Sequence, residues 1–241
     1  MIQVENLTRR YGDFTAVDDV NFSIGRGEIV GLLGHNGAGK TTMLRAITGV
    51  VAAQCTDIRL GDKTISNIPT HRRIQLGLAL THQIVRPFRS MTPLDNVALA
   101  VGHRRVRRIV RAMLSIDRAL ERHRAVELLE LVGIAMHAHE PIGQQPLGVL
   151  KRLEVARALA LEPRLLLLDE PTNDLDVETL ELLEELLLDY SGTLLLVSHD
   201  RAFLDRVANR VVEVAPQYPG GSFGCTGSST TFLEKRAQHL Q

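Results

Sequence analysis

The most specific chemistry in the sequence lies in the glycine-rich segment GHNGAGKTT. Its G-x-x-x-x-G-K-T spacing lets the backbone wrap closely around an anion, and the positive end of a following helix adds to the attraction. Lys40, which we expect to be exposed, can reach the β- and γ-phosphates of a nucleotide, and the Thr41 hydroxyl can bind Mg²⁺. The predicted phosphate-binding residues are Gly34, His35, Asn36, Gly37, Ala38, Gly39, Lys40, Thr41 and Thr42.

Two adjacent acids follow an apolar run in RLLLLDEP. The run Leu165–Leu168 is typical of a buried parallel strand, and ligands bind at the carboxyl ends of such strands. Asp169 can therefore bind the metal ion while Glu170 polarises an attacking water. An ordinary capped strand end is the alternative, which the phosphate-binding segment disfavours.

A third apolar run, Thr193–Val197, leads into Ser-His-Asp. We expect His199 to lie beside the other strand ends, within reach of a γ-phosphate. Most histidines are structural, and only its position in this set distinguishes His199. The predicted catalytic residues are Glu170 and His199.

These residues require a sheet that brings three strand ends together. The apolar run Ile29–Leu33 predicts a strand before the phosphate-binding segment, and Met43–Ile47 begins a helical pattern. Alternation in Ile2–Asn6 and Val17–Ile24 predicts an N-terminal antiparallel layer. We expect an α/β fold: a P-loop NTPase core with a mainly parallel sheet, the antiparallel β layer and a helical subdomain.

The expected organisation divides the chain into three parts. Residues 1–83 and 151–215 are expected to form the P-loop NTPase core, and residues 84–150 a helical subdomain. Residues 216–241, rich in Gly, Ser and Thr, are expected to be loosely ordered before a short terminal helix.

Composition excludes several classes of protein. A hydrophobic content of 44% is enough for a core and excludes disorder for most of the chain. Lys+Arg and Asp+Glu are 28 each, so the charge balance does not point to a polyanionic partner. No apolar run approaches membrane-span length, and the N-terminus has no signal core. The two separated cysteines favour a reduced, cytosolic compartment.

At this point the sequence resembles the ABC-type ATPases over nearly the whole chain. The P-loop GHNGAGKTT, the Walker B strand LLLLDEP, the D-loop NDLD and the switch segment SHD occur in the family's order. The resemblance implies ATP and Mg²⁺ as cofactors. It also implies that Tyr11 stacks on adenine, that Gln83 contacts both nucleotide and metal, and that Asp176 is the D-loop aspartate. His199 then corresponds to the switch histidine.

The family's signature motif, usually LSGGQ, is altered here. Aligned on Gly148, the segment Gln145–Val149 is QPLGV, with Pro146 in place of the serine and Leu147 in place of the first glycine. In the family this motif completes the nucleotide site of a second subunit, so the resemblance implies a homodimer or a paralogous ATPase subunit as partner. The losses predict slow hydrolysis.

Two branches of the family share the resemblance. Through about residue 165, phrases such as ITGV and RLEVARALALEP are similar to the ATP-binding subunit of a branched-chain amino acid importer. That branch implies membrane-spanning subunits docked on the helical subdomain, at the cytoplasmic face of the membrane. From Thr172 onward, PTNDLDVETLELLEELLLDYSGTLLLVSHDRAFLD resembles the ABC-F proteins, which act on the ribosome. An ABC-F factor would need a second ATPase domain and a long charged linker. Neither occurs in this sequence, so we favour the importer. A nucleotide-binding module with little turnover is a third alternative.

One segment carries an unusual charge. Eight arginines and two acids occupy Arg104–Arg124, where apolar residues from Val106 to Leu114 follow one helical face. Contact with RNA or lipid headgroups is one interpretation, and a solvated face of the helical subdomain is the favoured one.

Overall fold

The computed structural model describes residues 1–35, 37–81, 87–103, 119–173, 175–215, 217–227 and 229–239. The chain forms two compact units: unit 1 comprises Met1–Leu80, Arg164–Pro171 and Ser191–Gln241, and unit 2 comprises Thr81–Pro163 and Thr172–Tyr190. The expected boundary after residue 150 is wrong in one respect. It falls inside the continuous helix α6, Leu147–Ala160, which lies wholly in unit 2.

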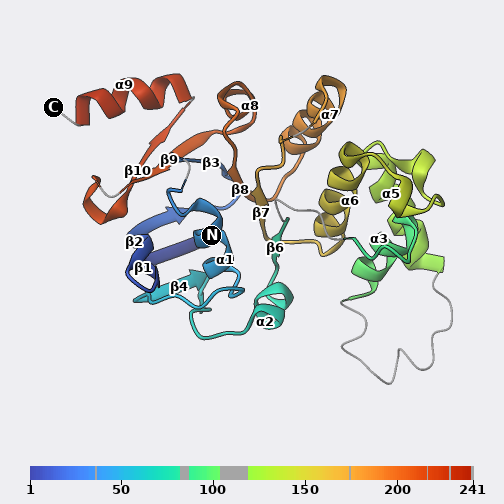
Figure 1. Cartoon of the computed structure of the whole chain (residues 1–241), viewed down its shortest axis with the longest axis horizontal. Coiled ribbons are helices and arrows are strands. Elements are labelled where there is room, and N and C mark those ends of the chain that lie inside the picture. The colour runs from blue at the N-terminus through green and yellow to red at the C-terminus, as the bar shows by residue number, and fades with distance from the viewer. Residues whose placement is uncertain are drawn as a thin grey trace. The chain divides into compact units, whose positions relative to one another are not determined.

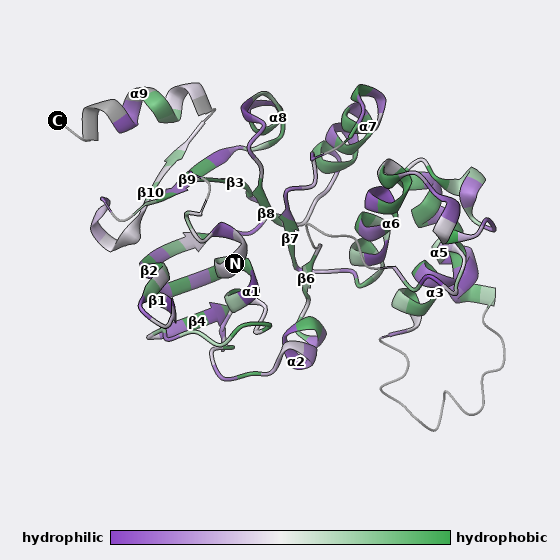
Figure 2. Ribbon diagram, in the orientation of Figure 1, coloured by the Kyte–Doolittle hydropathy of each residue, from purple (hydrophilic) through white to green (hydrophobic). Residues whose placement is uncertain are grey.

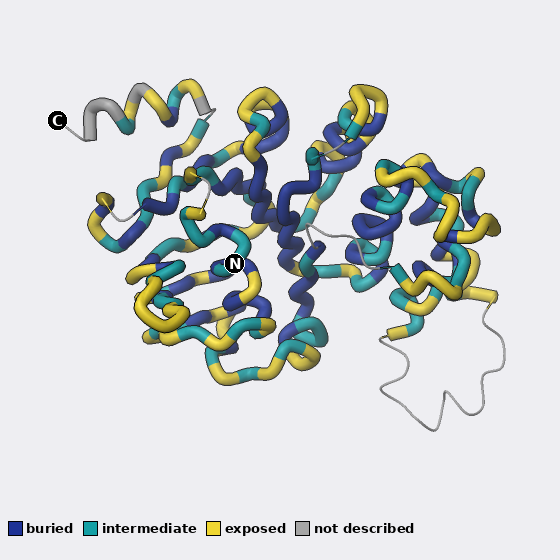
Figure 3. Tube along the Cα trace, in the orientation of Figure 1, coloured by how far each residue is buried: buried dark blue, intermediate teal, exposed yellow. Residues whose placement is uncertain are grey.

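Unit 1 is built around a six-stranded sheet of order β10-β9-β3-β8-β7-β6, in which every pairing except β9 with β10 is parallel (Figure 1). The α/β fold with a mainly parallel sheet is therefore confirmed. Central strands β7 and β8 are fully buried, as their continuous apolar sequences require (Figures 2 and 3). The strands are β3 Ile29–Leu33, β6 Leu78–Leu80, β7 Leu165–Asp169, β8 Thr193–Val197, β9 Arg210–Val214 and β10 Ser222–Thr226.

A second, antiparallel sheet of order β2-β1-β4-β5 confirms the predicted N-terminal layer. Its strands are β1 Ile2–Tyr11, β2 Phe14–Ile24, β4 Asp57–Leu60 and β5 Lys63–Thr64. Strand β1 runs beyond the predicted Ile2–Asn6, and its pairing with β2 shifts register several times. One shift makes Ala16 the extra residue of a β-bulge, since Val17 pairs with Arg9 and Thr15 with Arg10.

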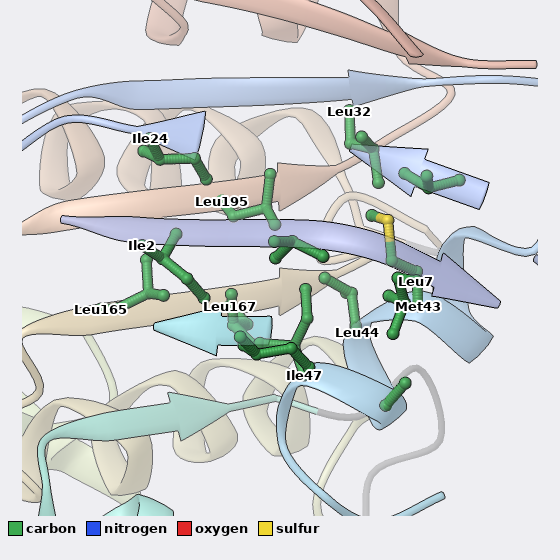
Figure 4. Close-up of a cluster of buried hydrophobic side chains, with 14 of the residues drawn as sticks. Ile2, Leu7, Ile24, Leu32, Met43, Leu44, Ile47, Leu165, Leu167 and Leu195 are labelled. Carbon is green, nitrogen blue, oxygen red and sulfur yellow. The ribbon is translucent and has the colours of Figure 1, made fainter. Parts of the chain in front are cut away.

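Helix α1, Lys40–Ile47, begins directly at the predicted phosphate-binding loop. Its apolar side chains Met43, Leu44 and Ile47 are fully buried. They share one cluster with residues of β1, β2 and the central strands (Figure 4). This packing fixes the start of α1 against both sheets of unit 1.

A buried arginine anchors the other end of α1. Arg73, in α2 (Thr70–Gln75), is 5% exposed and donates to the carbonyls of Ala46 and Ile47 at 3.0 and 2.7 Å. Burial lowers the pKa of its guanidinium. These carbonyls belong to the last turn of α1, where the helix dipole favours a nearby cation.

The C-terminal segment corrects the sequence prediction of a loosely ordered tail. Helix α8, Arg201–Val207, and β9 are followed by η3 Pro219–Gly221, β10 and α9 Ser229–His239. Phe232 of α9 is 1% exposed and packs with Val211 and Cys225. The Arg236 Nε contacts both the Tyr218 hydroxyl and a Glu213 carboxylate oxygen at 2.9 Å. Gly- and Ser-rich composition could not reveal these anchors.

Unit 2 is helical, as predicted. Gly133, with φ +67°, follows helix α5, Ala119–Leu131, and α6 stops before Glu162-Pro163. Residues 104–118 of the arginine-rich segment lie outside the described residues. In the described part of the chain no helix is long and apolar enough to span a bilayer. Besides α6, the elements are α3 Pro93–Gly102, α5 Ala119–Leu131, η1 Ala135–His137, η2 Ile142–Gln144 and α7 Val177–Leu188.

Candidate functional site

The glycine-rich loop connects β3 to α1, as predicted. Gly39, with φ +78°, is its last residue before the helix. A Cβ at this position would lie 1.9 Å from the Ala16 carbonyl oxygen, so only glycine fits. The bulge in β2 thus presses against the loop, and the β1–β2 hairpin lies beside the phosphate-binding segment.

Lys40 is 7% exposed, so the expectation of an exposed side chain is wrong. Its Nζ donates to the carbonyls of Gly34 and His35 at 2.7 and 3.1 Å. Burial lowers the pKa of Lys40, opposed by the carboxylates of Glu170 and Asp169. The loop's own carbonyls explain the burial: an ammonium removed from water must be hydrogen-bonded. The carbonyls hold the cation inside the loop.

The loop and the second motif meet at Thr41 and Asp169. The Thr41 hydroxyl donates to Asp169 Oδ1 at 3.1 Å, joining residues that are 128 positions apart. Asp169 is 4% exposed, and burial raises its pKa, opposed by the hydrogen bond from Thr41. A hydroxyl and a carboxylate are the hard oxygen ligands that Mg²⁺ binds, so the pair fits the predicted metal site.

Glu170 and His199 form a pair at the ends of neighbouring strands. Glu170 is 5% exposed and has φ +51°, a region that non-glycine residues rarely adopt. Its backbone N–H donates to the Val197 carbonyl at 2.9 Å, which stabilises this turn. Backbone strain of this kind gathers at functional sites. The His199 imidazole lies against the Glu170 carboxylate, so the two predicted catalytic residues are brought together.

Two aspartates of the family's motifs, Asp176 and Asp200, serve as helix caps. Asp200 accepts from the Phe203 N–H at 3.0 Å and begins α8 immediately after His199. In unit 2, Asp176 accepts from the Thr179 N–H at 2.8 Å and begins α7. Each cap fixes where the loop before it ends.

Tyr11 is the last residue of β1 and is 46% exposed. The Arg9 guanidinium lies over its ring, with Cζ 4.4 Å from the centroid. No motif in the sequence includes Arg9, although the alternation of a strand places it on the same face as Tyr11.

The altered signature begins α6. Pro146 is the N-cap and provides no capping hydrogen bond, and Leu147 is exposed. A Cβ at Gly148 would meet Thr179 Oγ1 at 3.7 Å, an ordinary contact, so packing inside this chain does not require glycine there. Val149 is 4% exposed and belongs to the packed side of the helix.

The predicted site residues thus fall into three groups. Unit 1 holds the described part of the phosphate loop, including Thr42, together with Asp169, Glu170, His199 and Tyr11. Gly148 belongs to unit 2. Asn36 and Gln83 lie outside the described residues, so the predicted contact of Gln83 with nucleotide and metal stays a prediction.

Comparison with known proteins gives a consistent result. A family model described as "ABC transporter" matches residues 17–173. The ATP-binding protein Uup of Caulobacter vibrioides is 34% identical over 98% of this chain and 35% of its own length. The high-affinity branched-chain amino acid transport ATP-binding protein LivG of Escherichia coli is 32% identical over 89% of this chain and 88% of its own. The energy-dependent translational throttle protein EttA of Haemophilus influenzae is 36% identical over 88% of this chain.

The relatives differ in length. The chain spans about a third of Uup and of EttA but most of LivG. Among solved structures, a dimeric post-hydrolysis state of the ATP-binding cassette MJ0796, bound to ADP and Pi, matches with a TM-score of 0.75 and 25% identity. That match covers 88% of this chain and 94% of the other.

Proposed function

The chain belongs to the ABC transporter family, and we propose that it is an ATP-binding and ATP-hydrolysing subunit that acts on Mg-ATP through unit 1. One observation carries the proposal: the Thr41 hydroxyl lies 3.1 Å from Asp169 Oδ1. The residue that would hold the metal from the phosphate loop thus meets the acid expected to complete the metal site. Lys40 directly precedes Thr41 and interacts electrostatically with the carboxylates of Glu170 and Asp169.

The chain's own residues supply positioning and charge. Loop N–H groups and Lys40 bind the phosphates, and Lys40 exchanges its bonds to Gly34 and His35 for phosphate oxygens. Thr41 and Asp169 would hold Mg²⁺, which would supply positive charge to the phosphate oxygens. Glu170 orients and polarises the attacking water, and His199 holds the Glu170 carboxylate and reaches the γ-phosphate. Tyr11 stacks on the base.

The second half of the site comes from another copy or a paralogous ATPase subunit. The start of α6 supports this assignment, because the helix has no capping side chain and Leu147 is exposed. First-turn N–H groups of a helix attract anions. A glycine at position 148 lowers helix stability, and packing in the described part of this chain does not require it. Close approach of a phosphate to the backbone would explain why glycine stands there. The lost serine and glycine of QPLGV make hydrolysis by the isolated chain slow.

The finer assignment is a branched-chain amino acid type importer. Its support is the LivG match, which covers 88% of that relative, and the importer-like phrases before residue 165. The subunit would dock membrane-spanning partners through unit 2, at the cytoplasmic face of the membrane.

A second candidate is an ABC-F-like ATPase that acts on the ribosome. It is favoured by the sequence from Thr172 onward and by the matches to Uup and EttA. The arginine-rich segment would then contact RNA.

Pelleting separates the two candidates. The purified Glu170→Gln variant, which we expect to retain bound Mg-ATP, is centrifuged with ribosomes or with membrane vesicles from the cells that encode it. The importer proposal expects ATP-dependent pelleting with vesicles and none with ribosomes. Pelleting with ribosomes alone would overturn it, and Lys40→Ala controls for nucleotide-independent adhesion.

A further inference from the structure

The strongest unassigned contact in unit 1 joins Arg9 to Tyr11. The Arg9 Cζ lies 4.4 Å from the centroid of the Tyr11 ring, within the range of a cation–π interaction. Tyr11 keeps 46% of its surface exposed. A half-exposed ring can sample several rotamers, and a guanidinium stacked on its face favours the orientation that the structure shows.

Hydrogen bonding does not explain where the Arg9 side chain lies. Its Nε is shielded from solvent and has no hydrogen-bond partner in the described part of the chain. An unpaired buried N–H of a charged group is costly, so the contact with the ring must offset a loss. An arginine side chain that simply extended into solvent would leave its Nε exposed to water.

The hairpin places the pair next to the phosphate-binding loop. Arg9 pairs across the hairpin with Val17, and a Cβ at Gly39 would lie 3.0 Å from Val17 Cγ2. The bulged Ala16 contacts the same glycine through its carbonyl. Arg9 and Tyr11 therefore belong to the strand pair that abuts the loop.

We propose that Arg9 is a positioning residue for base recognition: it holds the Tyr11 ring as a fixed platform on which the nucleotide base stacks. The inference rests on the proposed function, since it assigns the base to Tyr11. A preordered ring loses less conformational entropy when the base binds, and affinity rises without a new contact to the nucleotide. Arg9 is not a phosphate ligand in this assignment.

A nucleotide without its base separates this role from the others. Calorimetry measures the affinity of wild type and Arg9→Ala for Mg-ATP and for Mg-tripolyphosphate, which has no base to stack. We expect Arg9→Ala to weaken Mg-ATP binding about two- to fivefold, the range of one cation–π contact, and to leave tripolyphosphate binding unchanged. Arg9→Lys should recover part of the loss, and Arg9→Met should not.

Two controls complete the test. Arg10→Ala removes an exposed neighbouring charge from the same strand and should change neither affinity. In a Tyr11→Ala background, Arg9→Ala should have no further effect, because the platform is already gone.

The outcomes are distinguishable. If Arg9→Ala lost affinity equally for Mg-ATP and Mg-tripolyphosphate, Arg9 would act through phosphate contact or general stability, and the inference would be wrong. Unchanged affinity for Mg-ATP would also contradict the inference. If the wild type bound neither ligand, the proposed function itself would fail.

Discussion

The carboxylate of Glu170 is held at both oxygens by one residue, His199. The imidazole Nε2 lies 3.1 Å from Oε1, and the backbone N–H of His199 donates to Oε2 at 3.2 Å. A buried carboxylate whose two oxygens are fixed is aimed in one direction. His199 is thus placed to orient the carboxylate that we propose as the general base.

The first prediction concerns that orientation. We expect His199→Ala to slow ATP turnover by about 10²-fold, the cost of misplacing a reacting group by about 1 Å, with ATP affinity within a few-fold of wild type. His199→Gln keeps a donor and should retain more activity than His199→Ala. The rate of phosphate release should fall from wild type to His199→Gln to His199→Ala. Equal rates for all three proteins would refute the prediction.

The second prediction concerns Lys40. Lys40→Ala should raise the Kd for Mg-ATP by roughly 10²-fold or more, because charge-assisted bonds to two phosphates are lost. Because the side chain is buried, Lys40→Met is the matched control: it keeps most of the apolar stem and removes the charge. Calorimetry should show the same loss of Mg-ATP affinity in both variants. Tight ATP binding by Lys40→Met would show that the charge is not required.

The third prediction concerns the cap of α7. Hydrogen bonds from Thr179 hold the pKa of Asp176 below its ordinary value of 3.8. A depressed carboxyl pKa stabilises the fold above pH 4 or so, and this stability is lost as pH falls through the folded-state pKa. Thermal melts should therefore rank wild type above Asp176→Ala at pH 7, with Asp176→Asn closer to wild type. The advantage of wild type over Asp176→Asn should vanish in acid, and a constant difference would contradict the cap.

The fourth prediction concerns the C-terminal segment. Phe232→Ala should lower the free energy of unfolding by about 3–5 kcal/mol, since the ring is fully buried against β9 and β10. Leu233→Ala, at the exposed neighbouring position, is the control and should change it by less than about 1 kcal/mol. Denaturant titration compares them. Two equally small effects would mean that α9 does not pack as described.

The fifth prediction concerns the altered signature. Pro146→Ser with Leu147→Gly, both at exposed positions, should promote ATP-induced dimerisation and raise turnover by roughly tenfold or more, with monomer affinity unchanged. Restoring the glutamine by Val149→Gln is a different matter: Val149 is buried, so the third change should destabilise α6. Light scattering and phosphate release test the double variant. No change in either would exclude this segment from a nucleotide site.

The sequence predicts more of the site residues than of the tertiary contacts that position them. Glycine spacing, apolar runs and the acids after them indicated β3, β7, β8 and the residues that meet at their ends, because each motif carries its own local signal. Tertiary contacts carry none. The burial of Lys40 depends on two loop carbonyls, and the ordered tail depends on Phe232 and Arg236 meeting distant strands. The close contact of the Ala16 carbonyl with Gly39 depends on a bulge in β2 that no residue type indicates.

The proposed activity is hydrolysis of ATP by unit 1 with Glu170 as the general base. Its most direct test is the rate of phosphate release from Mg-ATP by wild type and by Glu170→Gln, measured at equal nucleotide occupancy. Glutamine keeps the shape and a hydrogen bond to His199 but removes the charge that polarises water. We predict slow wild-type turnover and a further reduction of roughly 10²-fold or more in the variant, with ATP affinity within a few-fold. Equal rates for the two proteins would contradict the assignment.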